Sequence, residues 1–138
     1  MANLRWDRQA RRRRRDVKLG VLMAAHADSI KSIERGETGT VVRLVGDIDL
    51  HRSHDVHQSL LDVCRERPNK LIVDLRDVAY MDSSGVGTLV EVFRQVNAYK
   101  GKLALVAPSA RVKNLFQITK LDQFFRIFAT PEEALGAD

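Results

Sequence analysis

The chain has 138 residues and a mass of 15.6 kDa, the usual size of one domain. Hydrophobic residues make up 44% and charged residues 30%, which excludes collagen-like, low-complexity and wholly disordered chains. The net charge of +5 is uneven, because residues 1–20 hold eight basic and two acidic side chains, so they carry +6 and the other 118 residues carry −1. No direct, specific contact with nucleic acid is therefore expected of the folded part.

The first residues differ in composition from the rest of the chain. Residues 1–27 are expected to form a basic, flexible N-terminal arm, and residues 28–138 a single domain. Two alternatives for the arm stay open: non-specific binding to nucleic acid or acidic lipid, and a short signal peptide with residues 19–25 as its apolar region. No apolar stretch approaches the roughly 20 residues of a membrane span. The lone Cys64 cannot form an internal disulfide, which favours a cytoplasmic location.

Short apolar runs alternate with segments of helical spacing, a pattern typical of an α/β domain. Strands are predicted over residues 29–34, 40–45, 71–75, 102–107 and 124–128. Helices are predicted from a cap at Ser53, from about Ser84, from Ser109 and from the capping box Thr130-Pro131-Glu132-Glu133. The first two strands suit a hairpin, and the almost continuous apolar run at 71–75 suits a strand covered on both faces. We therefore expect a mixed sheet of four or five strands packed with amphipathic helices.

Three histidines stand near the start of the first predicted helix. His51, His54 and His57 are spaced three residues apart, and imidazoles at such spacing can share a metal ion. No Cys or Glu cluster completes a coordination shell, so a solvated helix start is the preferred interpretation and no metal or cofactor is expected. Arg111 and Lys113 on the third helix are expected to be exposed charges.

The turn between the predicted central strand and the second helix is rich in small polar residues, Tyr80-Met81-Asp82-Ser83-Ser84-Gly85-Val86-Gly87. One interpretation is ordinary capping, in which Asp82 or Ser83 accepts hydrogen bonds from the first free N–H groups of the helix. The other is a phosphorylation site, because a helix N-terminus favours an added anion. The residues of the turn alone leave both interpretations open.

Three segments together resemble a known family. They are Gly46-Asp47-Ile48-Asp49, the strand Ile72-Val73-Asp74-Leu75 and the segment at 78–87, and they look like a STAS domain of the bacterial anti-sigma factor antagonist type. The resemblance runs from about Ser29 to Leu135. The long basic arm is not part of the family pattern. In such proteins the Asp-Ser-Ser-Gly turn is the phosphorylation motif.

The resemblance implies a regulatory partner switch. The unmodified antagonist binds an anti-sigma factor that is also a serine kinase, and so releases a sigma factor. Phosphorylation breaks the complex, and a serine/threonine phosphatase resets it. Carried onto this sequence, the phosphorylated residue is Ser83, and Asp82 positions its hydroxyl. The residues expected to bind the partner are Gly46, Asp47, Asp49, Asp82, Ser84 and Gly85.

Two other functions are alternatives to this switch. An enzyme with Ser83 as nucleophile would need a base and an oxyanion hole, yet the G-x-S-x-G elbow is absent and the histidines lie far away in sequence. No Walker A lysine follows the glycines. The chain is therefore not expected to be an enzyme. The alternative within the same family is a STAS subunit of a lipid-transport complex or a stress-signalling scaffold.

Overall fold

The structure, a computed structural model, describes residues 29–138. Five strands form one sheet in the order β2-β3-β4-β5-β6, in which β2 is antiparallel to β3 and the remaining pairs are parallel. The elements are β2 (Ile30–Arg35), β3 (Thr40–Val45), α3 (Leu50–Arg65), β4 (Lys70–Asp77), α4 (Ser83–Ala98), β5 (Lys102–Val106), α5 (Ala110–Ile118), β6 (Arg126–Phe128) and α6 (Pro131–Gly136). The predicted mixed α/β sheet is confirmed. The predicted arm at 1–27 lies outside the described residues.

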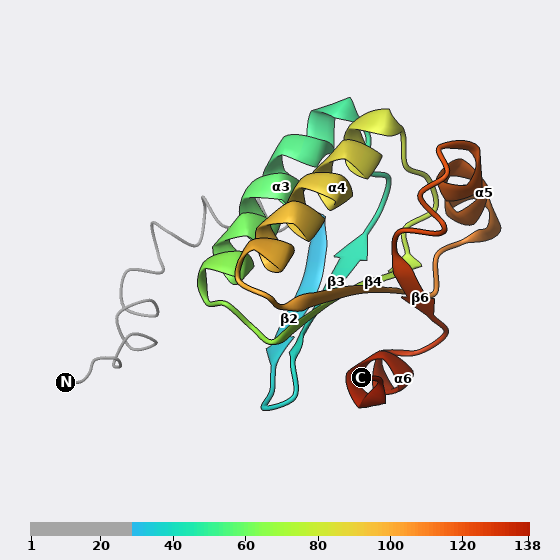
Figure 1. Ribbon diagram of the computed structural model, residues 1–138. Helices are drawn as coiled ribbons and strands as arrows, with labels where there is room; N and C mark the ends of the chain where they lie inside the picture. The colour runs from blue at the N-terminus through green and yellow to red at the C-terminus, as the bar shows by residue number, and fades with distance from the viewer. Residues whose placement is uncertain (1–28) are drawn as a thin grey trace, which may run out of the picture.

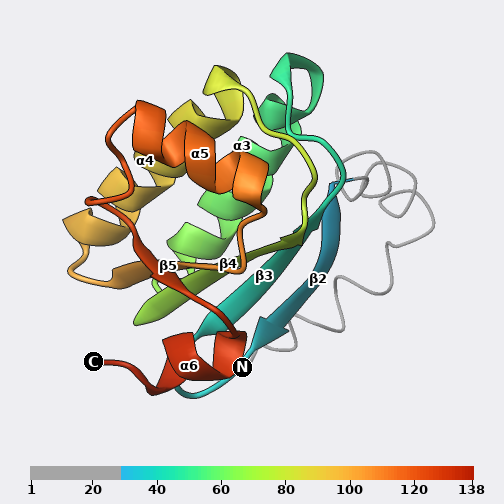
Figure 2. The same ribbon diagram turned by 90° about the vertical axis from the view of Figure 1, so that its right-hand side faces the viewer.

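Helices cover the two faces of the sheet unequally. Helices α3 and α4 lie side by side over one face with α5 beside them, and the short α6 lies against the other face (Figures 1 and 2). Leu71, Val73 and Leu75 of β4 point into the larger apolar cluster beneath α3, α4 and α5. Ile72 points to the other face, where it packs with Ala134 of α6. Both faces of β4 are therefore covered, which explains the apolar run in its sequence.

Helix α3 begins earlier than predicted, so the cap assigned to Ser53 is wrong. Asp49 is the N-cap, and its carboxylate accepts hydrogen bonds from the backbone N–H groups of His51 (3.0 Å) and Arg52 (3.2 Å). Ser53 lies inside the helix and is buried. A carboxylate that accepts from two free N–H groups at the positive end of the helix dipole is the stronger cap, and it extends the helix N-terminally.

The last strand is shorter than predicted. Only three residues of the predicted segment 124–128 pair with β5, because Phe124 and Phe125 belong to the turn that follows α5. The N–H groups of both residues donate to the carbonyl of Leu121, at 3.0 Å each. The ring of Phe124 packs 4.4 Å from that of Phe93 on α4. Aromatic packing against the helix layer therefore overrides the strand tendency of these residues.

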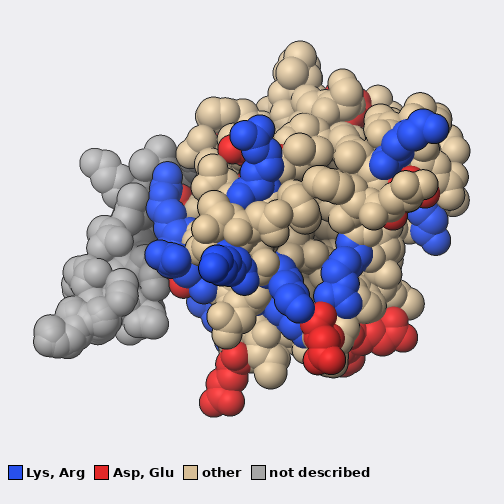
Figure 3. Space-filling model, in the orientation of Figure 1, with Lys and Arg blue, Asp and Glu red and all other residues tan. Residues whose placement is uncertain are grey.

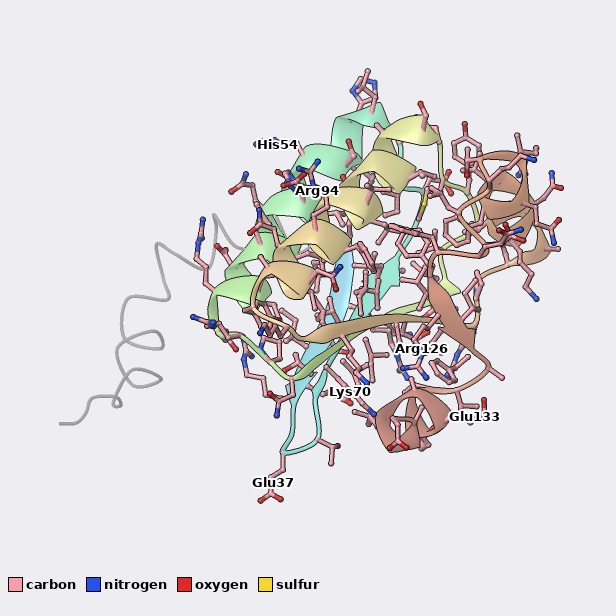
Figure 4. All side chains as sticks on the ribbon, in the orientation of Figure 1. Glu37, His54, Lys70, Arg94, Arg126 and Glu133 are labelled. Atoms are coloured by element: carbon pink, nitrogen blue, oxygen red, sulfur yellow. The ribbon has the colours of Figure 1, made fainter. Side chains whose placement is uncertain are left out.

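Helix α6 is held to the sheet by one lysine. The ammonium of Lys70, in β4, donates to the carbonyls of Ala134 (3.1 Å), Leu135 (2.7 Å) and Ala137. Figure 4 shows Lys70 between the sheet and α6. The other end of the helix is capped by Thr130, as its sequence predicts. The lysine thus satisfies carbonyls that the end of a short helix leaves free.

The carboxyl ends of β3, β4 and β5 meet at one edge of the sheet, and α3, α4 and α5 all begin there. The first described residue also lies at this edge, because the carbonyl of Ser29 accepts a hydrogen bond from Val45 N–H at 3.0 Å. Figure 3 shows Lys and Arg side chains gathered below α3 and α4, on the side away from this edge. In open α/β sheets, ligands bind at the edge formed by the carboxyl ends of the strands.

We predict that Val73→Asp prevents folding. Val73 is fully buried in the apolar cluster, so an unpaired carboxylate there should cost several kcal/mol, a large part of the stability of a domain of about this size. The neighbouring Asp74 is also fully buried, but it accepts hydrogen bonds from Arg43 Nε (3.1 Å) and Arg76 N–H (3.0 Å). Urea unfolding followed by circular dichroism measures the effect.

The control is Thr38→Asp, which places the same carboxylate in the exposed turn between β2 and β3. Its unfolding midpoint should stay close to that of the wild type. A Val73→Asp variant that unfolds cooperatively at the wild-type midpoint would contradict the central position of β4.

Candidate functional site

Two loops at the carboxyl edge of the sheet are joined by backbone hydrogen bonds. The N–H of Gly46 donates to the carbonyl of Asp77 (3.0 Å), and the N–H of Ile48 donates to that of Tyr80 (2.9 Å). The N–H of Asp82 completes the set by donating to Ile48 (3.2 Å). The Gly46–Asp49 loop and the loop before Ser83, two segments that the sequence singled out, therefore form one continuous surface.

Residues of the Gly46–Asp49 loop have different surroundings. Gly46 has a φ of +88°, a conformation that side chains rarely adopt, so the turn after β3 favours glycine. Asp47 is exposed and can contact a partner. The carboxylate of Asp49 is directed to the start of α3 as its cap. Of the two predicted partner-binding aspartates in this loop, Asp47 is thus the one that faces solvent.

Asp82 caps α4 in the same way. Its Oδ1 accepts hydrogen bonds from the N–H groups of Ser84 (2.9 Å) and Gly85 (3.4 Å) and from the hydroxyl of Ser84. In the described structure these hydrogen bonds join Asp82 to Ser84 and Gly85, and the predicted positioning of the Ser83 hydroxyl by Asp82 stays a prediction. The Ser84 hydroxyl, followed by nearby N–H groups, lowers the pKa of Asp82 from its usual range.

The two serines of the turn differ in their environment. Ser83, the first residue of α4, is exposed, and its hydroxyl has no hydrogen-bond partner within residues 29–138. Ser84 is half-buried and is hydrogen-bonded to Asp82. Of the two, Ser83 is therefore the hydroxyl that an approaching protein can reach.

Ser83 lines a groove of about 320 Å³ between its loop and α5. The loop contributes Tyr80, Met81 and Asp82, and α5 contributes Arg111, Asn114, Leu115 and Ile118.

Spacings of three and four residues place Arg111, Asn114 and Ile118 on one face of α5. The Arg111 guanidinium carbon lies 5.5 Å from the centre of the Tyr80 ring, a cation–π contact that joins α5 to the loop. Ile118 is 69% exposed and Tyr80 is 39% exposed. The sequence pattern does not predict this side of the groove, although an isoleucine outside the apolar stripe of α5 is a signal for it.

Gly85 is a spacer under the surface. It is buried, and a Cβ added there would lie 2.5 Å from Met81 Cγ and 3.0 Å from the carbonyl oxygen of Ile48. That carbonyl is the one that accepts from Asp82 N–H. Gly85 therefore allows the two loops to approach the first turn of α4, and its predicted contact with a partner stays a prediction.

The three histidines of α3 do not converge with other ligands. His51 and His54 are exposed and His57 is half-buried. No group of three or more His, Cys, Asp and Glu side chains in residues 29–138 is arranged to hold a metal ion. No helix in the same residues is long and apolar enough to cross a membrane.

Comparison with known proteins places this arrangement in a family. Residues 27–134 match the profile of the STAS domain. The chain belongs to this family. The Asp-Ser-Ser-Gly turn is thus the start of α4 in a STAS domain.

Several STAS relatives are similar over most of their length. An anti-sigma-B factor antagonist of Bacillus subtilis is 33% identical over 100 residues, which cover 72% of this chain and 91% of the relative. A crystal structure of an anti-sigma factor antagonist from Mycobacterium paratuberculosis has 27% identity and a TM-score of 0.70, covering 78% of this chain and 92% of that one. Unphosphorylated SpoIIAA, also described as an anti-sigma factor antagonist, has 28% identity and a TM-score of 0.66, covering 75% and 91%.

The close approach at Gly85 gives a paired prediction. Gly85→Ala should lower the free energy of unfolding by about 1–3 kcal/mol, because the added methyl group overpacks the loops. Gly87→Ala, two residues later in the same helix, meets nothing within 4 Å and should raise it by about 0.5–1 kcal/mol through helix propensity. Urea unfolding compares both with the wild type. Equal effects of the two substitutions would contradict the role of Gly85.

The Asp82 cap predicts a pH dependence of stability. Because folding lowers its pKa, the carboxylate stabilises the fold above its unfolded pKa of about 3.9, and this is lost as pH falls through the folded pKa. Asp82→Asn should therefore be less stable than the wild type by about 0.5–1 kcal/mol at neutral pH, and the gap should close in acid. The measurement is the free energy of urea unfolding at a series of pH values from neutral to acid.

Asp47→Asn is the control for this experiment, because it removes an exposed carboxylate from the neighbouring loop that caps no helix. A gap between wild type and Asp82→Asn that stays constant with pH would show that the charge of Asp82 does not stabilise α4.

Proposed function

We propose that this protein is an anti-sigma factor antagonist whose binding to its partner is switched off by phosphorylation of Ser83. The single observation that carries the proposal is the difference between the two serines. Ser83 is exposed, without a hydrogen-bond partner in the described chain, and lines a groove, whereas the Ser84 hydroxyl is bound by Asp82. The antagonist relatives support the function, and a structure of SpoIIAA in its phosphorylated form supports the modification.

The surface around Ser83 has the features of a protein-binding site. Three large apolar side chains from separate elements are exposed there: Leu50 at the start of α3 (70%), Tyr80 (39%) and Ile118 on α5 (69%). The N–H of Leu50 is among the groups that lower the pKa of Asp82, the residue before Ser83. Exposed aromatic and aliphatic side chains around a polar centre are typical anchors of protein interfaces. The partner in this proposal is an anti-sigma factor that is also a serine kinase.

The modification transfers a phosphoryl group from ATP to Ser83. The hydroxyl oxygen attacks the γ-phosphorus and loses its proton to a base on the kinase, while the bond from the γ-phosphorus to the oxygen of the departing ADP breaks. A serine/threonine phosphatase reverses the change by hydrolysis, which restores the hydroxyl and releases phosphate. The proposed role of this chain is that of a substrate and binding partner in the cytoplasm, not that of an enzyme.

Phosphorylation changes the charge of the binding surface. A phosphoserine carries about −1.5 to −2 at neutral pH, beside the existing carboxylate of Asp82. Formation of the complex would then require the removal of water from this charge within an apolar rim. A loss of about 3 kcal/mol would weaken binding more than a hundredfold. The domain itself need not unfold, because Ser83 is exposed.

We predict that Ser83→Ala abolishes phosphorylation and leaves binding intact. The chain is incubated with an anti-sigma factor kinase of the same organism and ATP, and intact mass reports the transfer of one phosphoryl group. Ser84→Ala is the matched control and should still be modified, since Ser83 keeps its exposure. Ser83→Asp should bind the kinase more weakly than the wild type, because it carries part of the charge of phosphate.

Full modification of Ser83→Ala would place the acceptor at another residue. Wild-type affinity of Ser83→Asp would show that negative charge at this turn is not the switch. If no anti-sigma factor binds either form, the lipid-transport or scaffold function of the same fold becomes the better interpretation.

A further inference from the structure

The groove beside Ser83 holds a guanidinium without an acidic partner. Arg111 is exposed and stacks on Tyr80, and it forms no ion pair with any residue in 29–138. It is the one cation among the described residues that line the groove. Lys113, two positions along α5, lines a separate groove with Pro108 and Phe128. Arg111 is therefore the positive charge directed to the side of α5 that faces Ser83.

The start of α4 offers little to a phosphate on Ser83. The N–H groups of Ser84 and Gly85, which a helix N-terminus would otherwise present to an anion, already donate to Asp82. The Asp82 carboxylate, which lines the same groove, repels a second anion close to it. A phosphoryl group on the exposed Ser83 oxygen is thus favoured toward the opposite wall of the groove, where Arg111 and Asn114 of α5 supply hydrogen-bond donors.

We propose that Arg111, assisted by the Asn114 amide, is an intramolecular receptor for the phosphoryl group of Ser83. The proposal rests on the proposed phosphorylation of Ser83. Arginine suits this role because its planar fork of N–H groups binds two phosphate oxygens at once, and Asn114 adds a neutral donor from the next turn of the same helix face. The ligand is a phosphate monoester on the chain itself.

This contact adds a second element to the switch. The guanidinium that would bind the phosphoryl group lies over the ring of Tyr80, so this binding changes the surroundings of one anchor of the partner surface. The groove between the loop and α5 then holds a charged bridge where the unmodified surface is open. Phosphorylation therefore changes the shape of the partner surface as well as its charge.

The test uses the full chain with phosphoserine placed genetically at position 83, so that no kinase is needed. The second ionisation of the phosphate is followed by ³¹P NMR in the wild type, Arg111→Gln, Arg111→Lys and Lys113→Gln. A nearby guanidinium favours the doubly charged phosphate, whereas Asp82 opposes it in every variant. The titration midpoint should lie about half a pH unit or more lower in the wild type than in Arg111→Gln.

Lys113→Gln removes one positive charge from the same helix and should titrate like the wild type. Arg111→Lys should lie between the wild type and Arg111→Gln, because the charge remains and the fork is lost. The NMR signals of the Tyr80 ring should shift on phosphorylation in the wild type and not in Arg111→Gln. Equal titration midpoints for the wild type and Arg111→Gln would overturn the proposal. A midpoint in Lys113→Gln that is raised as much as in Arg111→Gln would also overturn it.

The two proposals fail in different ways. If a kinase modifies Ser83 but the midpoint does not depend on Arg111, the receptor is wrong and the partner switch stands. If the midpoint depends on Arg111 but no kinase modifies Ser83, the receptor stands and the proposed function fails.

Discussion

The backbone pairing between the Gly46–Asp49 loop and the loop before α4 is the constraint on which the site depends. Ile48 contributes both its N–H and its carbonyl to this pairing, and the absence of a side chain at Gly85 keeps the space beneath it free. The pairing sets the positions at which α3 and α4 begin, so their two aspartate caps lie at the same edge of the sheet. The exposure of Ser83 therefore depends on where this pairing places the start of α4, not on the polarity of the serine side chain.

Local chemistry made much of this fold predictable from the sequence. Periodicity predicts the buried strand around Val73 and the apolar stripes of the helices. The resemblance to a family motif points to the Asp-Ser-Ser-Gly turn as the site. Predictions were wrong where two signals competed. Ser53 is an acceptable cap, but the charged Asp49 is the stronger one and starts the helix earlier. Phe124 suits a strand, but packing against Phe93 places it in a turn. The α5 side of the groove depends on tertiary contacts that spacing cannot reveal.

The carboxylate of Asp82 gives the two neighbouring serines different roles. By accepting from the Ser84 hydroxyl and from two N–H groups, it stabilises the helix start and leaves Ser83 as the exposed hydroxyl of the turn. The two N–H groups that donate to Asp82 would otherwise be able to bind an anion. A charge added at Ser83 is consequently directed outward, to groups on other elements, and its effect extends beyond the turn.

The position of Ser29 has a consequence for the partner surface. Its carbonyl accepts a hydrogen bond from Val45 N–H at the end of β3, immediately before the turn at Gly46. The strand end that pairs with Ser29 therefore continues directly into the loop that pairs with the segment before Ser83. A change that breaks this first hydrogen bond of the described fold is thus transmitted to the edge of the sheet that carries Ser83.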